Sequence, residues 1–308
     1  MPMMLVFRQI LCILLYILVG YVAGKIHWIG PELRKDLTTL CANLILPFTI
    51  LSSSRQTLDA QGFKNLGIAV TVILLVFGLT LAVSLLIHRL RRSGNAIRAA
   101  STGLVTFPNC TFLGLPLCQA LFGDMGILYN VAALLVFNVL FFAVQYALFT
   151  GERFHLRLLL TPGMVSTLIL IPMLLLQIHF PDPVQTVVGN IGSMITPLSL
   201  IIIGVMMSEN RLVSLLTEKK AYMIVVIRNL VIPLLACLLL RIVPLESMEK
   251  LCVLIYIACP CATLTSLYAI KADKEPELCG RTVLMSTLFF AVTLPLIIAA
   301  GQRILNVT

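Results

Sequence analysis

Two short stretches carry residues whose types and spacing could bind a charged solute. Pro108-Asn109-Cys110-Thr111 and Pro260-Cys261-Ala262-Thr263 share the pattern Pro-x-x-Thr and lie 152 positions apart in a chain of 308 residues. A proline inside a helix removes one backbone hydrogen bond and clashes with the preceding turn. Each stretch is therefore predicted to interrupt a helix and to start a new half-helix, whose first amides have no intrahelical acceptor.

Helix starts of this kind favour a negatively charged solute. A helix N-terminus carries about half a positive charge and presents backbone N–H donors, so two that meet from opposite sides amount to about +1. Asn109 could add a side-chain amide, and Thr111 and Thr263 a hydroxyl each. The residues predicted to bind the solute are Pro108, Asn109, Cys110, Thr111, Gly114, Pro260, Cys261, Ala262, Thr263 and Asn43.

The elements that must position these residues are apolar. The chain is 59% hydrophobic and 11% charged, with a mean hydropathy of +1.04, whereas about a quarter of the residues of a soluble domain are charged. The composition therefore indicates an integral membrane protein whose surroundings are the lipid bilayer. At about 20 apolar residues per crossing, ten spans are expected, at residues 4–24, 37–54, 66–88, 99–121, 126–149, 161–179, 188–208, 221–241, 251–270 and 282–302.

The two Pro-x-x-Thr stretches fall inside the fourth and the ninth span. In hydrocarbon an interrupted helix survives only where it is packed in protein or lines a wet cavity. Two interrupted spans in corresponding halves of a chain are typical of a transporter's binding site. The expected fold is all-α, with helices 1–5 in residues 1–150, helices 6–10 in residues 151–308, and the broken helices 4 and 9 crossing each other.

The two halves are predicted to be inverted repeats within one membrane domain, because an odd number of crossings per half makes the second half enter from the opposite face. Leu46-Pro47-Phe48 corresponds to Thr196-Pro197-Leu198, 150 positions later, and Leu140–Val144 recurs letter for letter as Leu288–Val292, 148 positions later. Together with the Pro-x-x-Thr pair, these matches keep one order and nearly one offset, which favours an internal repeat.

Basic residues indicate the orientation. Fifteen Lys and Arg residues fall in the loops after odd-numbered spans, against six on the opposite side with both termini included. Cytoplasmic loops are enriched in Lys and Arg, so we expect a multi-pass protein of the plasma membrane with both termini extracytoplasmic. The net charge of +9 is thereby explained by topology, and no nucleic-acid partner is expected.

The types of residue inside the spans exclude several activities. All thirteen Asp and Glu residues lie in loops or at span ends, which argues against a cation exchanger based on membrane carboxylates and against an aspartyl intramembrane protease. The sequence has no Gly-x-Ser-x-Gly and no His-Glu-x-x-His motif, so we expect no enzyme, no catalytic residues and no cofactor. Arg228 is the one deep charge, and it is expected to extend towards the cytoplasmic face.

Two other functions stay open at this point. Cys259 and Cys261 flank a proline in a membrane helix and could ligate a soft metal ion such as Cu(I), although no resident metal is expected. A channel-like or sensory membrane protein could bind the same anions without cycling between two states. Exchange of solute across the membrane separates a carrier from a passive pore.

The fourth span also carries a recognisable pattern. Pro108–Leu117, PNCTFLGLPL, followed by Gly123, resembles the fourth-helix signature of the auxin efflux carrier family, which includes bacterial permeases for malate, malonate and related acids. Pro197–Leu200 with Gly204 is similar to the family's seventh helix, and Ser286-Thr287-Leu288 with Thr293–Leu296 is similar to its end. The resemblance covers essentially the whole chain and is most specific in the fourth span.

This resemblance implies ten helices in two inverted repeats, a crossover of broken helices four and nine, and a scaffold part and a transport part that move against each other. It also implies that Asn109 contacts a substrate carboxylate. The second interrupted stretch resembles the family less closely, because Cys261 stands where the family often has a polar amide.

From the residues of the two stretches and from the resemblance together, we expect a secondary carrier for a small organic acid that works by alternating access. Coupling to H⁺ or Na⁺ and a homodimeric assembly are left open.

Overall fold

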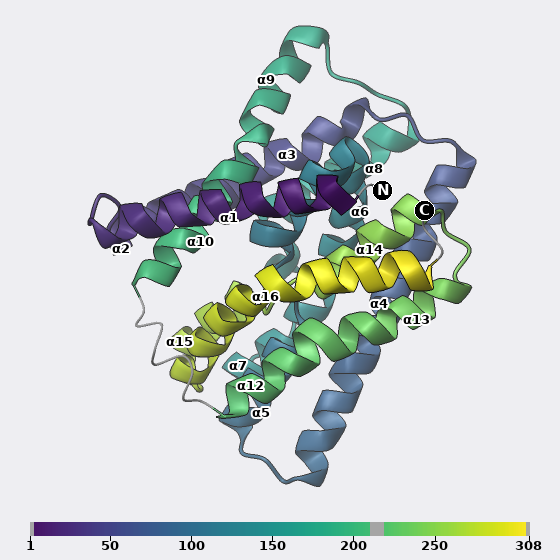
Figure 1. Ribbon diagram of the computed structural model, residues 1–308. Coiled ribbons are helices and arrows are strands. Elements are labelled where there is room, and N and C mark those ends of the chain that lie inside the picture. The colour runs from purple at the N-terminus through teal and green to yellow at the C-terminus, as the bar shows by residue number, and fades with distance from the viewer. Residues whose placement is uncertain (1–2, 210–218, 306–308) are drawn as a thin grey trace. The chain divides into compact units, whose positions relative to one another are not determined.

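The computed structural model describes residues 3–209 and 219–305 (Figure 1). Within these ranges all named elements are helical, and the β-structure consists of an isolated antiparallel bridge between Pro108 and Cys261. The chain forms two compact units, and each unit draws on both halves of the sequence. In the described ranges the first unit comprises residues 3–67, 111–135 and 160–209, and the second comprises residues 68–110, 136–159 and 219–305.

Seven helical runs in the described part of the chain are long and apolar enough to cross a membrane, which makes this a multi-pass membrane protein. They are Arg8–Lys25, Pro31–Arg55, Ala60–Leu90, Cys110–Thr150, Asp182–Ser208, Lys219–Ile242 and Pro276–Ile304. A further apolar helix, Pro162–Leu175, is shorter. The ten crossings and the inverted relation of the two halves stay predictions.

The difference between seven runs and ten expected spans has a local cause. The fourth and ninth expected spans are interrupted, at residues 107–109 and 259–262, so each is divided into shorter helices. The long run Cys110–Thr150 bends at Gly123, whose φ of 62° and ψ of −142° are not helical. A positive φ is readily adopted by glycine, which has no Cβ. The helix bounds on either side of residues 107–109 and 259–262 confirm the interruptions that are expected at Pro108 and Pro260.

Three π-helical segments each end two residues before a proline. They are η1 (Cys41–Ile45) before Pro47, η3 (Cys110–Gly114) before Pro116 and η6 (Ile227–Val231) before Pro233. A proline has no N–H for the carbonyl four residues earlier. The wider i→i+5 turn is the local adjustment found at these positions, and π-helical turns are frequent at functional sites.

The first unit is held by close contacts between helix backbones. α1 lies along α10 (Figure 1), and a Cβ added to Gly204 would be 2.0 Å from the carbonyl oxygen of Ile17. Thr49 donates a hydrogen bond to the carbonyl of Gly192 over 2.8 Å and so joins α3 to α9. The helices are α1 (Met3–Lys25), α2 (Pro31–Leu40), η1, α3 (Leu46–Ser52), η2 (Ser53–Arg55), α8 (Pro162–Leu175), α9 (Asp182–Ser193) and α10 (Ile195–Ser208), with parts of α4 (Ala60–Leu90), η3 and α6 (Leu115–Leu140).

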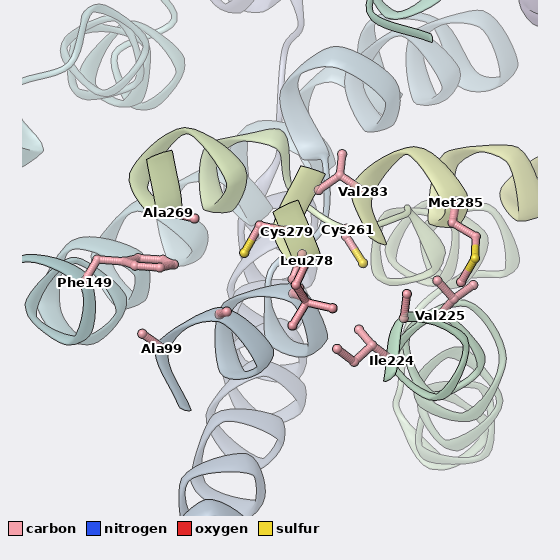
Figure 2. Close-up of a cluster of buried hydrophobic side chains, with 13 residues drawn as sticks. Ala99, Phe149, Ile224, Val225, Cys261, Ala269, Leu278, Cys279, Val283 and Met285 are labelled. Carbon is pink, nitrogen blue, oxygen red and sulfur yellow. The ribbon is translucent and has the colours of Figure 1, made fainter. Parts of the chain in front are cut away.

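The second unit is built around a buried hydrophobic cluster. Figure 2 shows Cys261 of the second interruption and Cys279 of α16 packed among the aliphatic side chains of Leu278 and Val283. Its helices are α5 (Asn95–Thr106), η4 (Phe141–Gln145), α7 (Tyr146–Thr150), η5 (Leu156–Leu159), α12 (Lys219–Val226), η6, α13 (Ile232–Ile242), α14 (Ser247–Ala258), α15 (Thr263–Lys271) and α16 (Pro276–Ile304), with most of α4 (Ala60–Leu90) and the end of α6 (Leu115–Leu140).

The predicted repeats at residues 1–150 and 151–308 cut across these units, because each unit takes segments from both of them. Arg211 is one of the fifteen basic residues in the loops after odd-numbered expected spans, and it lies outside the described residues.

Candidate functional site

The two interruptions lie against each other inside the second unit. The backbone amide of Asn109 donates to the carbonyl of Pro260 over 2.7 Å, and the amide of Ala262 donates to the carbonyl of Phe107 over 2.9 Å. This is the antiparallel bridge of Pro108 and Cys261. The interruption after α5 and the one after α14 therefore cross as a two-bond antiparallel pair, which we call the crossing.

The sequence accounts for the extended backbone at the crossing. The residue before a proline is pushed out of the helical region, and Phe107 (φ −99°, ψ 124°) and Cys259 (φ −54°, ψ 147°) both precede one. The backbone groups freed by the prolines bind each other, which satisfies polar groups that hydrocarbon cannot. Phe107, Pro108, Asn109 and all four residues 259–262 are buried.

Arg228 of η6 is bonded to the two helices that end at the crossing, and the expectation that it extends towards the cytoplasmic face is wrong. Its side chain is 0% exposed. The guanidinium donates to the carbonyls of Ile257 (2.6 Å) and Cys259 (3.1 Å) at the end of α14. It also donates to those of Val105 (3.4 Å) and Thr106 (3.2 Å) at the end of α5. Both helices end here with unpaired carbonyls, and these hold Arg228 in the interior.

A second polar group supports the crossing from α16. The hydroxyl of Ser286 accepts a hydrogen bond from the amide of Cys261 over 2.9 Å and donates to Oδ1 of Asn229 over 2.8 Å. Nδ2 of Asn229 in turn donates to the Ser286 carbonyl over 2.8 Å. All three residues are buried. The sequence alone does not predict Ser286 as a site residue, and the signal that points to it is its place in Ser286-Thr287-Leu288, at the end of the family resemblance.

The start of α15 retains hydrogen-bonding capacity. The amides of Asn109, Cys261 and Ala262 are engaged within the crossing and its support. Among the described residues no acceptor binds the backbone amides of Thr263 and Leu264, the first two residues of α15. The hydroxyl of Thr265, one residue later, is also buried without a partner in the described part of the chain. A helix start with unpaired amides is suited to an anion.

The other predicted residues are placed as follows. Cys110 is buried at 2% exposure, and Asn109 at 4%. Thr111 and Gly114 lie in η3, in the part of the chain that belongs to the first unit, and Thr111 is half-buried. Asn43 lies in η1 of the first unit and is exposed. The second unit thus brings together Pro108, Asn109, Cys110, Pro260, Cys261, Ala262 and Thr263.

The two cysteines of the soft-metal alternative point to different surroundings. The thiol of Cys259 donates a hydrogen bond to the carbonyl of Ile255 over 3.4 Å. Cys261 packs in the hydrophobic cluster (Figure 2). No group of three or more His, Cys, Asp or Glu side chains that could hold a metal ion is found among the described residues. The arrangement gives the soft-metal alternative no added support.

Interrupted membrane helices occur in many transporter folds. The family model described as "Membrane transport protein" matches residues 5–156 and 148–298, so the chain belongs to this family of auxin efflux carrier-type proteins. A relative from Methanothermobacter thermautotrophicus (strain Delta H), described as an uncharacterized transporter, is 23% identical over 295 residues, which are 94% of this chain and 96% of the relative. Membership implies a small-molecule substrate and a protein embedded in the bilayer.

Proposed function

We propose that this protein is a secondary carrier of small organic anions, of the mono- or dicarboxylate class, with the substrate bound at the crossing. The observation that carries the proposal is the antiparallel pairing of the two interrupted helices through the amides of Asn109 and Ala262. Interrupted backbone at membrane depth is tolerated where protein buries it or where it lines a cavity. Half-helix starts at such a place attract anionic groups.

The proposed binding groups lie at the start of α15 and on the strand of the crossing opposite to it. The amides of Thr263 and Leu264 and the hydroxyl of Thr265 begin α15, and the side chain of Asn109 belongs to the opposite strand of the crossing. A carboxylate accepts several N–H and O–H donors at once, and charge-assisted bonds of this kind are about twice as strong as neutral ones. We retain Pro108, Cys110, Thr111, Gly114, Pro260, Cys261, Ala262 and Asn43 as further members of the proposed site.

Alternating access is assigned to the two units. The second unit contains the crossing, the buried guanidinium of Arg228 and the polar group of Asn229 and Ser286, so we propose that it is the transport part. The first unit, with its close backbone contacts between α1 and α10, is proposed as the scaffold. The same proposal includes ten crossings in two inverted repeats, and a plasma-membrane location with both termini extracytoplasmic.

Coupling is proposed to use the substrate's own acid group. Among the described residues the buried carboxylate is that of Glu249, which lies in the first turn of α14 and accepts from the amide of Glu246 over 2.8 Å. It serves as a helix cap. A proton would then enter with the substrate, whereas Na⁺ coupling through backbone carbonyls and a homodimeric assembly are the variants to be tested beside it.

The test is exchange in proteoliposomes. Purified protein is reconstituted, and uptake of radiolabelled malonate, succinate or propionate is measured with and without the same unlabelled acid inside. A carrier shows faster uptake when internal substrate is present, because the loaded site returns more readily than the empty one. Uptake that internal substrate does not accelerate would replace the carrier by a channel, and vesicles that accumulate none of these acids would overturn the substrate class.

A further inference from the structure

The guanidinium of Arg228 is a buried charge that has no part in the proposed binding of the substrate. Its four hydrogen bonds all end on backbone carbonyls, two from the end of α5 and two from the end of α14. The ion pairs within the described residues are Arg34–Glu209, Arg55–Asp124 and Arg281–Glu277. Arg228 is therefore held in the interior by carbonyl dipoles, without an acidic partner among the described side chains.

The charges at the crossing can be added from the helix ends. α5 and α14 end there, and each C-terminus carries about half a negative charge. The half-helices that follow start there, at Cys110 and Thr263, and each N-terminus carries about half a positive charge. The half-charges of the four ends sum to zero, so the helix ends by themselves give the crossing no net positive charge.

Arg228 changes this balance. An arginine side chain stays protonated in proteins, so its full positive charge offsets the two negative helix ends that it contacts. Of the four helix ends, the two positive starts are then left in the sum, at about +1 in total. We infer that Arg228 is the specificity-determining residue that makes the crossing select a negatively charged solute, an inference that rests on the proposed function. Arg228 acts through the charges of the helix ends and does not touch the solute.

The side chain suits this role in its geometry as well as its charge. A planar guanidinium presents five donors in a rigid fork, and three of its nitrogens reach carbonyls on two helices here. A lysine would keep the charge but could not bridge both helix ends in this way. A glutamine would keep an amide donor and lose the charge. The two substitutions therefore separate the charge of Arg228 from its bridging contacts.

The experiment measures binding of malonate, succinate and propionate, each paired with its neutral amide, to the purified protein by calorimetry. The quantity compared is the ratio of the dissociation constants of amide and acid. We expect Arg228→Gln to lower this ratio tenfold or more, while Arg228→Lys keeps it within threefold of the wild type although its thermal stability falls. Arg241→Gln removes an exposed charge at the end of α13. It should leave the ratio of the dissociation constants and the thermal stability unchanged.

The outcomes separate this inference from the function on which it rests. A wild-type protein that binds none of the three acids contradicts the proposed substrate class. A wild type that binds, together with a folded Arg228→Gln variant that keeps the wild-type ratio, overturns the role of Arg228. If Arg228→Gln does not fold, Arg228→Lys decides: a folded lysine variant that loses the preference for the acid over its amide shows that bridging, and not charge, is what the site needs.

Discussion

The two units solve the problem of packing helices in a membrane in different ways. In the first, helix backbones approach at glycines, as at Gly204 of α10 and Gly20, whose added Cβ would lie 2.1 Å from the carbonyl oxygen of Ile201. In the second, buried polar side chains connect the helices, with Arg228, Asn229 and Ser286 bonded around the crossing. Small residues and interhelical hydrogen bonds are the two means by which membrane helices associate.

This difference agrees with the division into scaffold and transport part that we propose. Close backbone packing gives rigid contacts that need no polar group, which suits a scaffold. A polar interior is expensive in a membrane and is kept where it serves a function. η1 and η6 differ in the same way: both contain Asn-Leu-x-x-Pro, yet Asn43 is exposed, whereas Asn229 is buried and hydrogen-bonded.

The largest loss of stability is expected from Gly204→Ala in the first unit. The new Cβ would meet the carbonyl oxygen of Ile17 at 2.0 Å and the amide nitrogen of Tyr21 at 2.7 Å. These are backbone atoms, so α1 and α10 must separate. Overpacking costs about 1–3 kcal/mol and sometimes more, and we expect about 3 kcal/mol here, measured by thermal unfolding in detergent.

Gly189→Ala is the matched control for that substitution, because α9 leaves nothing within 4 Å of the added Cβ. Its unfolding temperature should not fall. If Gly204→Ala were equally harmless, the close approach of α1 and α10 would not be what holds the first unit.

A smaller loss of stability is expected from alanine substitution of Asn229, and almost none from alanine substitution of Asn43. Asn229→Ala removes the acceptor of the Ser286 hydroxyl and the donor to the Ser286 carbonyl. A buried polar group left without its partner costs about 1–3 kcal/mol, so we expect a loss of about 2 kcal/mol. Asn43→Ala, at an exposed position, should stay within about 0.5 kcal/mol. Equal losses in unfolding experiments would contradict the division between the two π-helical segments.

The smallest effect on stability, with a clear effect on transport, is expected from Gly103→Ala in α5. The added Cβ would meet Nε2 of Gln145 at 2.6 Å and Cγ2 of Thr265 at 2.7 Å. These are side chains that can shift, so the cost should be about 1 kcal/mol. A displaced Thr265 would disturb the start of α15 and slow carboxylate uptake. Gly78→Ala, with nothing within 4 Å, is the control, and undiminished uptake by Gly103→Ala would remove Thr265 from the proposed site.

Much of the fold follows from local sequence. Pro108 and Pro260 each lack the N–H that an uninterrupted helix needs, which is a covalent property, and both helices are interrupted at these prolines. The pairing of the two interruptions does not follow from local sequence. The Pro-x-x-Thr pattern aligns Pro108 with Pro260, whereas the bridge joins Pro108 to Cys261, the next residue. Arg228 could not be placed from the sequence, because its partners lie 29 and 31 residues later and 122 and 123 residues earlier in the chain. An amphipathic side chain near a span end can extend to water or be held by buried carbonyls, and packing decides between these.

The central claim is that the crossing binds the carboxylate of the substrate, and the most direct measurement is the affinity of the Asn109→Ala variant. Binding of malonate, succinate and propionate is measured by calorimetry on the wild type, on Asn109→Ala and on Asn190→Ala, which alters an exposed asparagine of α9. A hydrogen bond to a charged group contributes about 1.5–3 kcal/mol, so Asn109→Ala should raise the dissociation constant about 10- to 100-fold, and Asn190→Ala should leave it unchanged. Wild-type affinity in a folded Asn109→Ala variant would contradict the assignment of the crossing as the binding site.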